Sequence, residues 1–268
     1  MRVAAAQMTS GPDVSANLAV AEELAGAAAQ AGAGLLALPE NFAFMGLHDA
    51  DKRRIAEPHG AGPIQRWLAA TARRLKLWIV GGTIPLARSE GERVAAACLV
   101  FDDAGCEAGR YDKIHLFDVD LPERGEKYRE SANIAPGSSP NVLQTPFGRL
   151  GLSVCYDVRF PELYRELSAS GAQLLTIPSA FTPLTGRAHW EPLLRARAIE
   201  NLCYVVAPAQ SGFHPSARET YGDSMIVDYW GRVLARRPRG RGIVVAEIDL
   251  ARQAQARAAF PALAHRVL

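Results

Sequence analysis

Long apolar runs, a charge excess and paired cysteines are all missing from this 268-residue sequence. No stretch approaches the about 18 consecutive apolar residues that cross a bilayer, and the N-terminal apolar stretch is too short for a secretory leader. Because 30 basic residues oppose 28 acidic ones, the net charge is only +2, and no global field favours nucleic acid or an anionic membrane. We expect a cytoplasmic protein whose partner is a small molecule, with no binding to nucleic acid or membranes.

Cysteine and histidine are scarce and lack metal-binding spacing. The four cysteines, Cys98, Cys106, Cys155 and Cys203, contain no CxxC pair, and the six histidines include no i, i+4 pair and no HExxH motif. Cys98 and Cys203 fall within strand-like apolar runs, where burial is the usual outcome. The simplest interpretation is a set of reduced thiols and no metal site.

Strand-like and helical patterns alternate along the chain. Apolar runs and period-two patterns predict strands over 2–7, 35–40, 77–85, 94–105, 107–112, 149–154, 172–180, 203–210, 223–230, 232–236 and 242–250. Helices are predicted over 15–33, 62–75, 161–170 and 188–201. With 49% hydrophobic residues and no Gly/Ser linker or repeat, we expect one α/β sandwich with sheets inside and helices outside.

Cys155 lies at a predicted strand-to-helix transition. Leu152 and Val154 alternate with small residues before it, and Pro161 opens a helix after it. A thiol at such a corner can point out of the core, close to helix-start amides that stabilise a thiolate or an anion on a bound substrate. The alternative is a buried and inert cysteine. Only candidate partner residues elsewhere in the chain can decide between a reactive and an inert thiol.

Two charged residues, like Cys155, follow the ends of predicted strands. Glu40 follows the apolar run LLALP, and Lys113 follows the short strand EAGRYD. Each has an ordinary alternative, a structural ion pair for Glu40 and a solvated surface group for Lys113. Because α/β sheets place their chemistry at the carboxyl ends of strands, the three side chains together predict a mechanism. Glu40 would take the proton of Cys155, while Lys113 and the backbone N–H after Cys155 would stabilise the anion formed on an amide or nitrile.

Three motifs in this order resemble the nitrilase superfamily of carbon–nitrogen hydrolases. They are LPENF around Glu40, YDKIHLFDVD around Lys113 and GLSVCYDVRFPELYREL around Cys155. The resemblance implies a catalytic triad with Glu40 as general base, Lys113 as oxyanion stabiliser and Cys155 as the acylated nucleophile. It also implies that Glu130, in the segment EKYRESANIAPG, supports the triad by orienting Lys113 or the attacking water. No cofactor or metal is required in this family.

The same resemblance carries expectations about architecture. It implies a four-layer αββα sandwich that forms a homodimer or a larger homo-oligomer. It also implies a single carbon–nitrogen hydrolase domain over residues 1–268, with a core of about 1–250 and a C-terminal extension over 251–268.

Within the superfamily, the segments YDVRFPEL, TGRAHWE and RARAIENLCYVVA look most like the Nit branch. That branch includes amidases for deaminated glutathione and for omega-amides of 2-oxo dicarboxylic acids, and the first looks closer. Both substrates carry carboxylates, so a basic residue is expected at the pocket rim. The residues expected to contact the substrate are Tyr156, Arg159, Phe181, Thr182 and Arg187. Packing for the aromatic and threonine side chains, and structural ion pairs for the arginines, remain alternatives.

Three positions depart from the pattern of the family. Asp223 stands where relatives commonly have histidine, and Tyr229 and Arg187 stand where they have proline. None of these touches the triad, but they weaken the case for assigning the substrate of a relative to this chain.

Other interpretations remain. A Cys–His hydrolase would pair Cys155 with His115 or His189. GLSVC comes close to the serine elbow GxSxG, although Ser153 is predicted inside the strand. A non-catalytic binding protein on the same fold would be expected to lose one of the three reacting side chains. The arginine cluster over 236–242 is expected to be a solvated hairpin loop rather than a nucleic-acid site.

Overall fold

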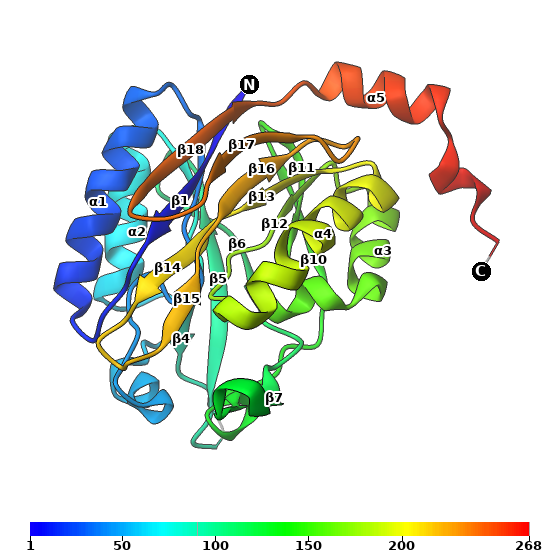
Figure 1. Cartoon of the computed structure of the whole chain (residues 1–268). Helices are drawn as coiled ribbons and strands as arrows, with labels where there is room; N and C mark the ends of the chain where they lie inside the picture. Colours follow the sequence, from blue (N-terminus) through cyan, green and yellow to red (C-terminus); the bar gives the residue numbers. More distant parts are fainter. Residues whose placement is uncertain (90, 268) are drawn as a thin grey trace.

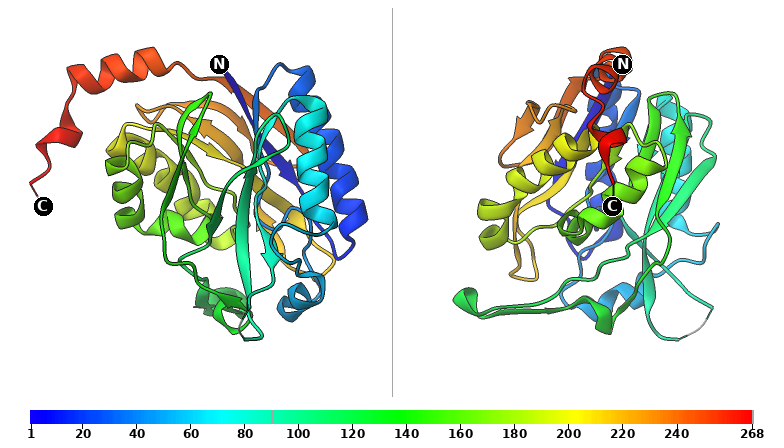
Figure 2. Two further views of the ribbon diagram at one scale, coloured as in Figure 1. Left: turned by 180° about the vertical axis from the view of Figure 1, so that it is seen from behind. Right: turned by 90° about the vertical axis from the view of Figure 1, so that its right-hand side faces the viewer.

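Helices and sheets form four layers in the computed structural model, which describes residues 1–89 and 91–267 (Figure 1). Helices α1 (Val14–Gln30) and α2 (Pro63–Leu75) cover one sheet, and α3 (Pro161–Ala169) and α4 (Pro183–Asn201) cover the other. The remaining faces of the two sheets pack against each other (Figure 2). This arrangement confirms the four-layer sandwich that the sequence predicts.

The larger sheet has ten strands in the described part of the chain. They are β1 (Arg2–Met8), β2 (Leu35–Ala37), β3 (Trp78–Val80), β4 (Ile84–Leu86), β5 (Val94–Phe101), β6 (Glu107–Asp112), β9 (Ile134–Ala135), β14 (Ala209–Phe213), β15 (Glu219–Tyr221) and β18 (Gly242–Glu247). In β1, Val3 and Ala5 pack between the sheets, whereas Ala4 and Ala6 pack with the helices. The apolar middle of this strand therefore has both faces buried.

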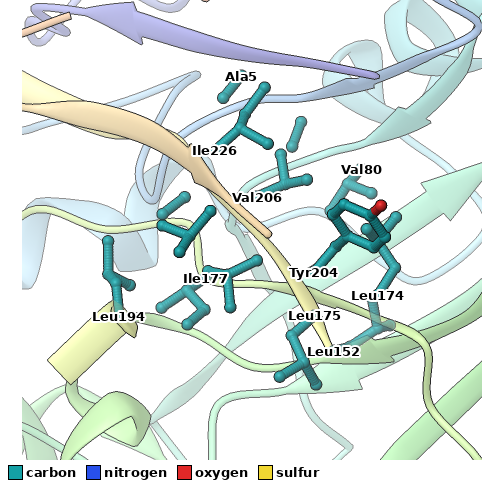
Figure 3. Packing of buried hydrophobic residues seen from close by; sticks show 14 of the residues in the cluster. Ala5, Val80, Leu152, Leu174, Leu175, Ile177, Leu194, Tyr204, Val206 and Ile226 are labelled. Atoms are coloured by element: carbon teal, nitrogen blue, oxygen red, sulfur yellow. The ribbon is translucent and has the colours of Figure 1, made fainter. Parts of the chain in front are cut away.

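The smaller sheet has six strands within the same described residues. They are β10 (Asn141–Thr145), β11 (Gly148–Leu152), β12 (Leu174–Thr176), β13 (Tyr204–Ala207), β16 (Ser224–Val227) and β17 (Val233–Arg237). Strands β11, β12 and β13 are parallel. Figure 3 shows Leu152, Leu174 and Val206 from these strands in one apolar cluster with Ala5 and Val80 of the larger sheet.

The run CYVVAPAQ, predicted as one strand, is two strands on different sheets. β13 ends at Ala207 and β14 begins at Ala209, with Pro208 between them. Because proline has no N–H to donate to a ladder, pairing in the smaller sheet stops there and the chain passes to the larger sheet. The crossing brings Gln210 to Glu40, whose carbonyl oxygen accepts a 3.0 Å hydrogen bond from the Gln210 amide.

Two other predictions about strands were wrong. The run over 77–85 splits into β3 and β4, because Gly82 has φ +50° and a Cβ there would lie 2.0 Å from the Pro39 carbonyl oxygen. The arginine-rich loop over 236–242 does not close a hairpin, since β17 pairs with β16 and β18 pairs with β1. That loop carries the chain from one sheet to the other.

Several elements have no counterpart in the sequence prediction. Strands β7 (Asp118–Leu121) and β8 (Glu126–Arg129) form a projecting hairpin (Figure 2). Short 3₁₀ helices cover Asp49–Ile55 (η1), Pro122–Arg124 (η2), Glu130–Ala132 (η3), Cys155–Arg159 (η4) and Ala262–His265 (η5). Helix α4 begins at Pro183 rather than at 188, because the Thr182 side chain accepts a hydrogen bond from the Thr185 N–H and caps it.

Helix α5 (Leu250–Ala259) occupies the first half of the expected C-terminal extension (Figure 1). Gln253 and Arg257 attach it to the body by donating to the Leu202 carbonyl oxygen at 2.8 and 3.1 Å. The division of one domain into a core and an extension stays a prediction. None of the helices in the described residues has the length and apolar character needed to cross a membrane.

Candidate active site

The three predicted catalytic residues follow strands of both sheets. Glu40 and Lys113 come after β2 and β6 of the larger sheet, and Cys155 comes after β11 of the smaller sheet. All three side chains are buried. The site therefore lies where the two sheets meet, and the sequence prediction that the three residues follow strand ends is confirmed.

Lys113 is held between two carboxylates. Its Nζ donates to Glu40 Oε1 at 2.7 Å and to the two oxygens of Glu130 at 3.0 and 2.9 Å. Glu130 is itself fixed, because its Oε2 accepts a 2.7 Å hydrogen bond from the Phe117 N–H. Charge-assisted hydrogen bonds of this length orient an ammonium strongly. Glu130 therefore holds the Lys113 ammonium through two of its hydrogen bonds, and its supporting role in catalysis stays a prediction.

Cys155 occupies a strained turn. Its φ is +49°, in the left-handed region, and its N–H donates to the Pro178 carbonyl oxygen at 2.9 Å. Such a conformation costs of order 1–3 kcal/mol for a non-glycine residue and is maintained by its surroundings. The chain enters η4 at Cys155 and reaches α3 only at Pro161, so the predicted direct passage from strand to helix contains a 3₁₀ turn.

A buried aspartate holds this turn in place. Asp157 accepts hydrogen bonds from the Val154 N–H at 2.8 Å and from the His115 N–H at 3.0 Å. Tyr111 donates to the same carboxylate at 2.8 Å. The turn around Cys155 is thus tied to the segment that carries Lys113, and the two candidate catalytic residues are positioned together.

Burial and neighbouring charges set the protonation of the three groups. Burial raises the pKa of the Glu40 carboxyl, but the attraction and hydrogen bond of Lys113 outweigh it and hold that pKa below 4.5. Burial lowers the pKa of Lys113, yet Glu130 and Glu40 raise it well above 10.5. Burial and the Glu40 charge raise the pKa of the Cys155 thiol above 9.0. The resting site therefore contains a carboxylate, an ammonium and a thiol.

The thiol has a base close to it. The Glu40 carboxylate and the Ala180 N–H both lie near enough to Cys155 to shift the pKa of its thiol, the first upward and the second downward. A thiol whose pKa is raised needs such a base at the moment of attack. The arrangement suits proton transfer to Glu40 during bond formation better than a preformed thiolate.

A pocket opens over these groups and is lined by Glu40, Lys113, Glu130 and Cys155. Of the five residues predicted to contact substrate, four line it: Tyr156, Arg159, Phe181 and Thr182. The fifth, Arg187, is exposed on α4 and donates to the Pro183 carbonyl oxygen at 3.2 Å, outside the cavity lining.

Sequence reasoning missed several residues of the cavity. Lys52 and Asp49 of η1, Tyr128 of β8 and Arg218 of the β14–β15 loop all contribute to its walls. They come from segments without a strand or helix pattern in the sequence, so only the fold brings them to the site. Arg218 adds a cation that no motif indicated.

The alternative nucleophiles and bases are engaged elsewhere. The Nδ1 atom of His115 lies 2.7 Å from Asp157 Oδ1, and the His115 ring stacks on Phe160. His189 is exposed beside Arg159. Neither histidine lines the cavity. Ser153 lies just after β11, not inside it, and its hydroxyl is hydrogen-bonded within the core. These contacts favour Glu40 over a histidine as the base for Cys155.

The unusual residues at positions 223 and 229 have structural contacts. Asp223 is buried and accepts two hydrogen bonds from Arg236, at 2.6 and 2.8 Å. Its carbonyl oxygen accepts one from the Trp190 indole at 2.8 Å. Tyr229 packs edge-on against Tyr204 with ring centroids 5.3 Å apart. Within residues 1–89 and 91–267, no cluster of three His, Cys, Asp or Glu side chains has an arrangement that could hold a metal ion.

Comparison with known proteins gives a consistent family. The family model described as carbon-nitrogen hydrolase matches residues 2–258. The deaminated glutathione amidase of Synechocystis sp. (strain PCC 6803 / GT-S) is 47% identical over 268 residues, covering 98% of this chain and 97% of that relative.

Solved structures agree with this match. The C. elegans NitFhit protein superposes with a TM-score of 0.92 at 39% identity, covering 99% of this chain, which spans only 65% of that longer chain. A mutant amidase from Nesterenkonia sp. AN1, which carries acrylamide added to its active site cysteine, has a TM-score of 0.80 at 29% identity. The match covers 97% of this chain and 98% of the amidase chain. The chain therefore belongs to the carbon–nitrogen hydrolase family, in the Nit branch of the nitrilase superfamily, and is a hydrolase of carbon–nitrogen bonds other than peptide bonds.

Proposed function

We propose that this chain is an amidase that hydrolyses deaminated glutathione through a thioester on Cys155. The observation that carries the proposal is the ammonium of Lys113, 2.7–3.0 Å from two carboxylates beside the Cys155 thiol. The substrate is supported by the name of the Synechocystis relative, which matches nearly the whole chain.

Acylation begins when the Cys155 sulfur attacks the amide carbonyl carbon. Glu40 accepts the thiol proton as the carbon–sulfur bond forms, and the carbonyl oxygen becomes an oxyanion. The Lys113 ammonium and the Tyr156 N–H stabilise this charge, which is typically worth several kcal/mol in a buried site. The carbon–nitrogen bond then breaks as Glu40 returns the proton to the leaving amine.

Deacylation repeats these roles with water. Glu40 takes a proton from a water molecule as its oxygen attacks the thioester carbon, and Lys113 again stabilises the oxyanion. The carbon–sulfur bond breaks, the acid leaves, and Cys155 regains its proton from Glu40. Glu130 keeps Lys113 in place during both acylation and deacylation.

Two other functions remain as candidates. An amidase for monoamides of 2-oxo dicarboxylic acids would also use the arginine-lined cavity, since these substrates carry a carboxylate. A binding protein without catalysis is the alternative from a different class. The presence of all three reacting side chains in contact speaks against it.

A substrate panel tests the proposal. We expect kcat/KM for deaminated glutathione to exceed that for 2-oxoglutaramate at least about tenfold, with N-carbamoyl amino acids and nitriles lower still. Release of the acid product is the measurement, with each substrate at the same protein concentration. Turnover of nitriles alone would overturn the proposed activity, and no turnover of any compound would favour the binding protein.

The pH dependence tests the assigned protonation states. Glu40 must be ionised and its pKa lies below 4.5, so activity is lost only as the pH falls through that lowered value. Lys113 must be protonated and its pKa lies well above 10.5. We therefore expect kcat/KM to be flat from about pH 6 to about pH 9. A tenfold rise per pH unit across this range would indicate a required thiolate and contradict the role of Glu40.

The proposal extends to a cytoplasmic protein that assembles as a homodimer or larger homo-oligomer. The four cysteines are free thiols, which suits a reducing compartment. Trp230, Phe260 and Ile199 are about half exposed, and the first two rings contact each other at 5.8 Å. Exposed aromatic groups of this kind support a contact between subunits.

A further inference from the structure

We propose that Arg218 binds a second substrate carboxylate, on the leaving-amine side of the scissile bond, and so selects amides that carry a carboxylate at each end. The inference rests on the proposed function and adds the substrate class to it. Arg218 lies on the loop between β14 and β15, which follows all three catalytic motifs in the sequence, and it lines the cavity.

Two of the four cations that line the cavity have no carboxylate partner among the described residues. Lys113 is neutralised by two glutamates and the charge of Lys52 acts on Glu40, but Arg159 and Arg218 form no ion pair with any residue in the described ranges. Arg159 contacts a histidine nitrogen at 3.1 Å, and Arg218 donates to a carbonyl oxygen at 2.9 Å. Because partly buried cations lose hydration, unpaired ones favour an anionic ligand.

Arg218 retains an unused donor. Its Nε is buried and has no hydrogen-bond partner among the described residues, while Nη2 donates to the Ala180 carbonyl oxygen. The guanidinium lies over the Tyr128 ring, 5.2 Å from its centroid. A buried donor without a partner costs stability, so its presence in a cavity wall indicates a group kept for a ligand.

The loop that carries Arg218 is rigidly anchored. His214 is buried, its Nδ1 lies 2.8 Å from the Ser10 carbonyl oxygen, and its Nε2 lies 2.8 Å from Thr220 Oγ1. The His214 N–H donates to the Arg218 carbonyl oxygen at 2.8 Å. Since the backbone of Arg218 is fixed, its side chain needs little reordering to bind a carboxylate.

The two arginines have different places in the cavity. Arg159 packs 5.3 Å from the ring centroid of Phe181, which is only 6% exposed, so it belongs to the inner wall. Arg218 lies over the partly exposed Tyr128 ring of the projecting hairpin. The acyl group stays bound to Cys155 after the amine departs, so the amine has to occupy the open side. Arg159 therefore suits the acyl carboxylate and Arg218 the carboxylate of the leaving amine.

One pair of substrates separates these roles. The probes are deaminated glutathione and the same compound with its glycyl carboxylate converted to a primary carboxamide, and release of 2-oxoglutarate is measured for both. We expect Arg218→Met to lower kcat/KM for the carboxylate form at least about tenfold while changing the carboxamide form less than about threefold. Arg218→Lys keeps the charge but loses the planar fork, so it should retain part of the preference. Arg66→Met, an exposed residue of α2 outside the cavity, is the matched control and should change neither rate.

The outcomes distinguish the inference about Arg218 from the proposed function. A selective loss for the carboxylate form, with an unchanged thermal unfolding temperature, supports the inference. An equal loss for both forms, or no loss for either, overturns the inference while the proposed function stands. Wild-type protein that hydrolyses neither form overturns the proposed function and this inference with it.

Discussion

Replacing Cys155 with alanine is expected to lower kcat/KM for the amide substrate at least about 10⁴-fold, because the alanine variant has no sulfur to form the thioester. The fold should survive, since the change removes one buried atom group from a turn that Asp157 and Pro178 hold through backbone contacts. Product release by the purified variant, compared with wild type at equal concentration, is the measurement.

The chain provides a control for this substitution. Cys106 is an exposed free thiol that does not line the cavity, so Cys106→Ala should leave kcat/KM unchanged. A Cys155→Ala variant that keeps more than about a hundredth of the wild-type activity would show that another group is the nucleophile.

Replacing Lys113 with methionine is expected to lower kcat about 10³-fold, because the oxyanion loses its buried cation. The same change acts on the base. Glu40 stays buried but loses the attraction that lowers its pKa, so that pKa should rise above 4.5. The acid limb of the kcat/KM profile should therefore move to higher pH than in wild type.

Stability has to be measured beside activity in this variant. Removing the ammonium leaves the buried Glu40 and the partly buried Glu130 without their partner, and breaking a buried ion pair typically costs about 3–5 kcal/mol of folding free energy. Rates should be taken well below the unfolding temperature, with Lys76→Met, on the exposed end of α2, as the control. An unmoved acid limb in folded Lys113→Met protein would contradict the assigned contact between Lys113 and Glu40.

The positions of the candidate catalytic residues at strand ends were predictable from local patterns, and the resemblance to the family supplied their roles. Glu40, Lys113 and Cys155 each stand at the end of a short apolar or alternating run, and strand ends on neighbouring sheets meet in this architecture. The sandwich itself followed from the apolar runs, since a strand such as β1 needs a layer on both faces.

Other features depended on contacts that no local pattern records. The crossing at Pro208 depends on which sheet each half of a run joins, and the pairing of β17 and β18 depends on distant strands. Arg218 and Lys52 reach the cavity from loops, where apolar periodicity gives no signal. Arg187 illustrates the opposite case. The sequence suggested a loop beside the pocket, but Arg187 lies on α4 and does not line the cavity.

Mass spectrometry of protein quenched in acid during turnover tests the central claim most directly. With the amide that the substrate panel identifies, we expect the acyl group on the peptide that contains Cys155, sensitive to hydroxylamine and absent from Cys155→Ala protein. Full turnover with no acyl group on Cys155, or an acyl group on a different residue, would contradict a mechanism in which Glu40 and Lys113 serve this thiol.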